Sequence, residues 1–131
     1  MPITVEWDDE AHTVIVLDFD GAWTWDEYEA SRQEANVLLK QVSHPVAMIV
    51  DFHNSEYSPN DVLTHAHHAL DTTPINLRHF VLVGANPFLR HVYGVMTRVY
   101  RVLVARYTVM FADSREDARL RLSELCPNDS D

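Results

Sequence analysis

A histidine-rich segment in the middle of the chain holds the residue types that could do metal chemistry. Asp61, His65 and His68 are spaced so that, on a helix, they fall within about 60° of one another. One carboxylate and two imidazoles could bind iron or zinc, with His53 as a fourth ligand. The alternative, favoured because the sequence supplies no outer layer of polar groups, is a solvated helix face with the ion pairs Asp61–His65 and His67–Asp71. We therefore expect no bound metal and no other cofactor.

Ser58 and Pro59 mark the start of this helix. A serine cap followed by proline at the first helical position is typical of a helix N-terminus. A phosphate on Ser58 would face free backbone N–H groups and the positive end of the helix dipole. Glu56 and Asp61 would repel that phosphate. Ser58 is therefore a candidate regulatory phosphosite, with plain helix capping as the alternative.

A third helix, predicted over residues 87–104, is apolar around most of its circumference. Such a helix contacts a second surface as well as the sheet, which predicts an interaction site for a protein partner or a homodimer contact. The alternative is plain burial, with Phe88, Val92, Val95 and Val99 in the core. The predicted interaction surface joins the loop before the second helix to the arginines of the third: Asn54, Ser55, Tyr57, Asn60, Arg90, Arg98 and Arg101.

Two tryptophans flank Thr24 at the start of the first predicted helix. They could line a groove for a small apolar or amphipathic ligand, held between helices and sheet, in which case the protein would be a carrier. The alternative is that one tryptophan staples the helix start and the other anchors the core. The candidate pocket residues are Trp23, Trp25, Phe88, Met96 and Tyr100.

The sequence holds no motif for nucleophilic or phosphate chemistry. Gly84 alone follows a predicted strand, which is too few glycines for a phosphate-binding loop, and no serine nucleophile elbow is present. Cys126 has neither a histidine partner nor a positive helix end beside it. We expect a non-catalytic protein, and a metal enzyme at the histidine-rich helix is the least favoured hypothesis.

Charge is distributed unevenly along the 131 residues, whose net charge is −10. Residues 1–77 carry two basic against fourteen acidic side chains, whereas residues 78–121 carry eight arginines against three acidic side chains. The net charge argues against nucleic acid as a partner. The lone cysteine excludes an internal disulfide, and the apolar runs are far shorter than the roughly 20 residues that cross a bilayer. These features predict a soluble, cytoplasmic protein.

Alternating and continuous apolar patterns predict one α/β domain over residues 1–126, followed by a disordered tail at 127–131. Residues 3–7 and 12–19 form a predicted β-hairpin. A capping box at Thr24 and Glu27 opens a helix that ends near Val42. The remaining strands are predicted at 46–50, 78–85 and 107–112, and the remaining helices at 58–71, 87–104 and after Ser114. The order ββαβαβαβα predicts a mixed sheet of four or five strands.

Four segments resemble the STAS family, and in particular its divergent SpoIIAA-like members: Gly21–Ala22–Trp23–Thr24, VAMIVDF ending in Asp51 and Phe52, FVLVG, and FADSREDARLRL. The resemblance covers the chain from Ile3 to about Leu125. It implies a STAS-like fold and a protein-interaction or regulatory function. In the family, an Asp-Ser-Ser-Gly motif after the central strand is phosphorylated by a partner kinase. This chain lacks that motif, and Ser58 stands at the matching helix start.

Overall fold

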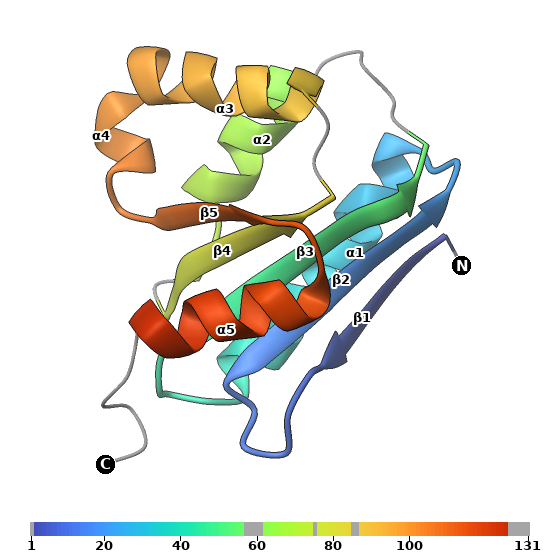
Figure 1. Ribbon diagram of the computed structural model, residues 1–131, viewed down its shortest axis with the longest axis vertical. Coiled ribbons are helices and arrows are strands. Elements are labelled where there is room, and N and C mark those ends of the chain that lie inside the picture. Colours follow the sequence, from blue (N-terminus) through green and yellow to red (C-terminus); the bar gives the residue numbers. More distant parts are fainter. Residues whose placement is uncertain (1, 57–61, 75, 85–86, 126–131) are drawn as a thin grey trace.

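The computed structural model describes residues 2–56, 62–74, 76–84 and 87–125. Within these residues the chain forms a single α/β domain with five strands and five helices (Figure 1). The strands are β1 (Ile3–Trp7), β2 (Val14–Gly21), β3 (Val46–Ser55), β4 (Leu77–Val83) and β5 (Thr108–Ala112). The helices are α1 (Trp25–Lys40), α2 (Val62–Asp71), α3 (Pro87–Val99), α4 (Arg101–Val104) and α5 (Arg115–Leu125).

The five strands form one mixed sheet, as predicted. Their order across the sheet is β1-β2-β3-β4-β5, which is also their order along the chain. β1 and β2 form the predicted antiparallel hairpin, and β2, β3, β4 and β5 run parallel. β3 is the central strand, and Val46 to Val50 are all buried, as the continuous apolar run predicts. The strand extends beyond the predicted run to Ser55, and the Asp51 side chain is buried as well.

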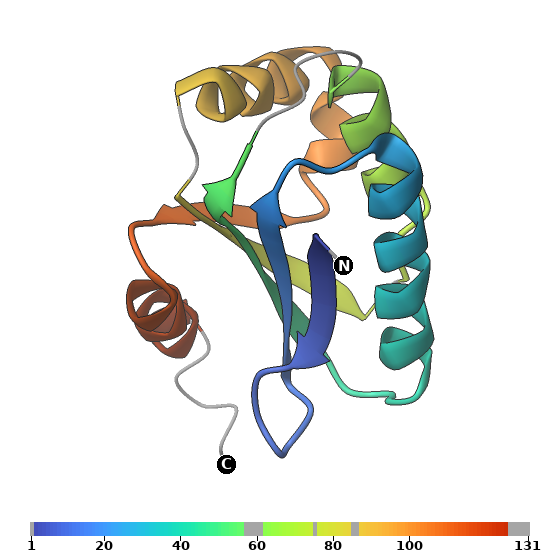
Figure 2. The same cartoon turned by 90° about the vertical axis from the view of Figure 1, so that its right-hand side faces the viewer.

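The sheet is covered on both faces, by different helices. Figure 2 shows α1 and α5 on opposite sides of the strands. On the α1 side, Leu39 packs in a cluster with Ile15 and Phe19 of β2. On the α5 side, Ala118 packs in a second cluster that includes Ile49 of β3. The apolar residues of both clusters are withdrawn from water, and this burial is the main source of stability of the domain.

Local signals at the helix starts agree with the structure. The Thr24 side chain accepts a hydrogen bond from the Glu27 amide, and the Glu27 carboxylate accepts one from the Thr24 amide, which completes the capping box. The rings of Trp23 and Tyr28 lie 6.1 Å apart, as expected for a hydrophobic staple. Ser114 caps α5 by accepting a hydrogen bond from the Asp117 amide.

The long helix predicted at 87–104 is wrong, because it breaks at Tyr100 into α3 and α4. Tyr100 has φ −115° and ψ 47°, outside the helical region.

Ring contacts attach α3 to β5: Tyr93 lies edge-on to Phe111, and the Arg90 guanidinium lies 4.4 Å from the centre of the Phe111 ring. Figures 1 and 2 show α2, α3 and α4 as one group, away from α5. None of the described helices is long and apolar enough to span a membrane.

Candidate functional site

The turn between α3 and α4 exposes apolar and basic side chains together. Val99 and Val102 have 60% and 82% of their surface exposed, and Arg98 and Arg101 are exposed beside them. This stretch lines an open depression of about 380 Å³. We refer to its lining residues as the α3–α4 surface: Arg98, Val99, Tyr100, Arg101, Val102 and Leu103. The predicted core position of Val99 is therefore wrong.

The helix break explains why the two valines face water. The Tyr100 amide donates to the Met96 carbonyl at 2.8 Å, and the Tyr100 carbonyl accepts from the Val104 amide at 2.9 Å. Met96 and Val104 are both buried and anchor the turn on either side. Because the chain changes direction between these anchors, Val99 and Val102 project away from the core.

The arginines of the α3–α4 surface are available to an external anion. In the described part of the chain, no carboxylate forms an ion pair with Arg98 or Arg101. A guanidinium stays charged at every physiological pH and binds carboxylates through two parallel hydrogen bonds. The predicted stripe of Arg90, Arg98 and Arg101 is divided by the helix break, and Arg90 packs on Phe111.

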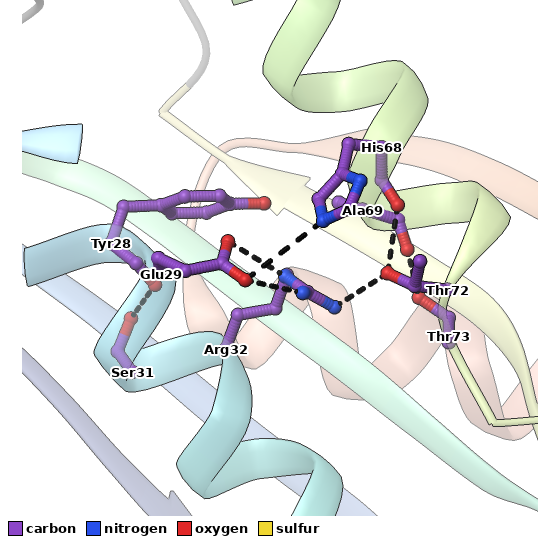
Figure 3. Close-up of polar contacts among 8 residues, drawn as sticks. All are labelled: Tyr28, Glu29, Ser31, Arg32, His68, Ala69, Thr72 and Thr73. Carbon is purple, nitrogen blue, oxygen red and sulfur yellow. Dashed lines mark hydrogen bonds and ion pairs between the residues drawn. The ribbon is translucent and has the colours of Figure 1, made fainter. Parts of the chain in front are cut away.

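A polar network holds α2 against α1 (Figure 3). Arg32 donates to both carboxylate oxygens of Glu29, at 2.6 and 3.2 Å, and to the Thr72 hydroxyl at 2.8 Å. His68 Nε2 lies 4.0 Å from the same Glu29 carboxylate. The hydrogen bonds from Arg32 lower the pKa of Glu29, against the opposing effect of burial. Burial raises the pKa of Tyr28, beside this network, to about 12, so its phenol stays neutral.

The histidines of α2 contact separate parts of the molecule. The His65 ring is stacked on Trp25 of α1, with centroids 3.9 Å apart. The His67 ring packs against Tyr100 of the α3–α4 surface, with centroids 4.2 Å apart. Asp61 lies outside the described residues, and among those described no three histidine, cysteine or acidic side chains are grouped to hold a metal ion. His65 and His68 therefore serve as contacts to α1 in the arrangement seen here.

The residues predicted to line a ligand pocket fall into two groups. Trp23 and Trp25 pack edge to face at the start of α1, with ring centroids 5.0 Å apart. Met96 is buried in α3, and Tyr100 lies on the α3–α4 surface. The side chain of Phe88 is outside the described part of the structure. Both tryptophans contact Tyr28, which agrees with their alternative role as staple and anchor.

The loop half of the predicted interaction surface begins at the end of β3. Asn54 is exposed there, and the half-buried Ser55 accepts a hydrogen bond from the Trp23 indole at 2.8 Å. The bond ties this strand end to the start of α1. The remaining predicted residues of the loop lie outside the described residues: Tyr57, Ser58 and Asn60.

An ion network that the sequence does not predict positions α5. Arg115 Nε donates to Asp51 at 2.7 Å, and its Nη2 lies 3.2 Å from Asp18. Burial acts to lower the pKa of Arg115, but the hydrogen bonds and charges of the two aspartates outweigh it and raise that pKa. At the other end of the sheet, Arg119 donates two hydrogen bonds to Asp8. These contacts join residues 64 and 111 positions apart, so no local pattern could reveal them.

Comparison with known proteins gives no match to any family model and no match among curated proteins.

Proposed function

We propose that this chain is a non-catalytic protein-interaction module that binds an acidic, partly apolar partner segment at the α3–α4 surface. The observation that carries the proposal is the pair of exposed valines flanked by two arginines that form no ion pair with any described carboxylate. Single exposed apolar residues are common on protein surfaces. Two of them together, beside arginines, are typical of a protein interface, because arginine is enriched there.

The charge distribution supports a partner with negative charge. Residues 78–121 are net basic in a chain whose net charge is −10. Carboxylates on a partner would be attracted to Arg98 and Arg101. The acidic remainder of the molecule would repel the same partner if it approached elsewhere on the surface. The same acidic remainder disfavours the uniform phosphate backbone of a nucleic acid.

The proposal includes a regulatory role of the STAS type. The element order, the mixed sheet and the central β3 followed by α2 support a STAS-like topology. Phosphorylation of Ser58 would add negative charge four positions in sequence before Val62, the first residue of α2, and α2 packs beside α3 and α4. Intact-mass measurement after incubation with a kinase from the same cells, with Ser58→Ala as the comparison, tests this part of the proposal.

A photocrosslinking experiment tests the interaction. A benzophenone amino acid replaces Val102 in one variant and, in a control, Leu120 of α5, another exposed apolar residue (58%). We expect the Val102 variant to crosslink to an acidic, apolar peptide in native cells, and Arg98→Glu/Arg101→Glu to abolish the product. A crosslinked second copy of the chain would identify a homodimer. Equal products from both positions, or a basic crosslinked peptide, would rule out the proposed surface.

A further inference from the structure

One titratable side chain of α2 contacts the α3–α4 surface. The His67 ring of α2 packs against the Tyr100 ring, with an angle of 33° between the ring planes. Tyr100 lines the surface depression together with Arg98 and Arg101. His67 therefore contacts one residue of the surface to which the two arginines belong.

The charge of this region changes with pH through the imidazole. Histidine gains a proton between about pH 8 and pH 5, whereas arginine stays charged throughout this range. A protonated His67 would lie against the face of Tyr100, where an aromatic ring attracts a cation. It would add one positive charge to a surface that already carries two.

We propose that His67 makes the α3–α4 surface pH-responsive, so that an acidic partner binds more tightly after His67 is protonated. The inference rests on the proposed function, because it concerns the same surface. One added charge at about 7 Å from a partner carboxylate in a water-like dielectric strengthens binding roughly two- to fivefold. Binding and protonation are reciprocal, so a bound carboxylate also favours the protonated imidazole.

Charged groups lie on both sides of α2. On the α3–α4 side, Arg98 and Arg101 carry positive charges that an acidic partner would neutralise. On the α1 side, Glu29 binds Arg32 and lies 4.0 Å from His68 Nε2. The contacts of His65 and His68 are with α1.

This separation provides a matched control on the same helix. His68 is 56% exposed and pairs with Glu29 rather than with the α3–α4 surface. His67→Gln and His68→Gln each remove one titratable group from α2, and both lower the total of eight histidines by one. The two variants therefore carry the same number of titratable side chains. Only His67→Gln removes the proton behind Tyr100.

The test measures binding of the full chain to a fluorescein-labelled twelve-residue peptide of alternating Asp and Leu, by anisotropy at pH 8.0 and 5.5 in low salt. The Asp side chains stay ionised over this range. We expect the wild-type and His68→Gln proteins to bind more tightly at pH 5.5, and His67→Gln to lose roughly two- to fivefold of that gain. His67→Lys, which is charged at both pH values, should bind tightly at both.

The outcomes separate the two hypotheses. If His67→Gln keeps the full pH dependence of His68→Gln, the inference is wrong although the surface still binds. If the His67→Lys protein binds no more tightly at pH 8.0 than the wild type, the inference is also refuted. The His67→Lys variant therefore provides the test if the His67→Gln protein does not fold. If wild-type protein binds the peptide at neither pH, the proposed function fails, and the inference fails with it.

Discussion

The three glycines of the chain give a quantitative test of how tightly β3 and β4 are joined. Gly84, directly after β4, has φ +69°, and a Cβ built there would lie 2.9 Å from the His53 Cα and 3.0 Å from its backbone nitrogen. Both atoms belong to the β3 backbone, which cannot move without disturbing the sheet. Alanine at this position combines an unfavourable left-handed conformation, about 1–2 kcal/mol, with an overlap costing about 1–3 kcal/mol.

We therefore expect Gly84→Ala to lower the free energy of unfolding by about 2–5 kcal/mol. The other two glycines isolate the two contributions. Gly21 also has a positive φ, +73°, but a Cβ there would meet nothing within 4 Å, so Gly21→Ala should cost only about 1–2 kcal/mol. Gly94 lies within α3 with the same open space, and Gly94→Ala should stabilise the protein by about 0.5–1 kcal/mol.

Urea denaturation followed by circular dichroism measures all three values under the same conditions. The expected order of stability is Gly94→Ala, wild type, Gly21→Ala and then Gly84→Ala. A Gly84→Ala protein as stable as Gly21→Ala would show that β3 and β4 separate freely at His53. The close approach of these strands would then have no role in fixing where the chain leaves the sheet toward α3.

Three further predictions test the ion networks and the proposed surface. Arg115→Met leaves the carboxylate of Asp51, a residue that is only 7% exposed, without the arginine that pairs with it. We expect this substitution to lower the free energy of unfolding, measured in urea, by about 2–4 kcal/mol. The control Arg121→Met, which breaks an exposed pair, should change it by less than about 0.5 kcal/mol. The hydrogen bond from Arg119 lowers the pKa of Asp8, so its stabilising effect is present above the ordinary carboxyl pKa and is lost as pH falls through the folded value. Thermal melts should then show that Asp8→Asn is less stable than the wild type at pH 6. The difference in stability should be at most about 1 kcal/mol, because Arg119 is 46% exposed, and it should shrink toward pH 2. Val102→Asp should leave the melting temperature unchanged within a degree or two but abolish peptide binding; a large loss of stability would place Val102 in the core instead.

The sequence predicts most of the fold because its local signals agree with its global pattern. The apolar run of β3 and the capping box at Thr24 and Glu27 each depend on neighbouring residues alone. The helix break at Tyr100 has no such signal, since neither proline nor glycine occurs between Thr97 and Val104. Packing of Met96 and Val104 imposes it, and tertiary packing is not visible in local propensity.

The candidate site was predicted only in part for the same reason. Arg98 and Arg101 were identified as basic residues of an apolar helix, but the exposure of the adjacent valines follows from the break. The contact between His67 and Tyr100 joins α2 to a turn more than thirty residues further along the chain. The four-residue spacing in the sequence predicts Asp71 as the partner of His67. The observed contact is instead with Tyr100, which is distant in sequence and therefore gives no local signal.

The neighbour order of the strands has a consequence for how the molecule is made. Each strand after the first pairs with the one synthesised before it. The ribosome synthesises the chain from its N-terminus, so the strand with which each new strand pairs has already been made when the new strand emerges. None of the five described strands has to be inserted between two others. When β2, β3 or β4 has paired with the strand before it, its other edge remains free to pair with the next strand. Such stepwise growth shortens the time in which unpaired backbone is exposed to other chains.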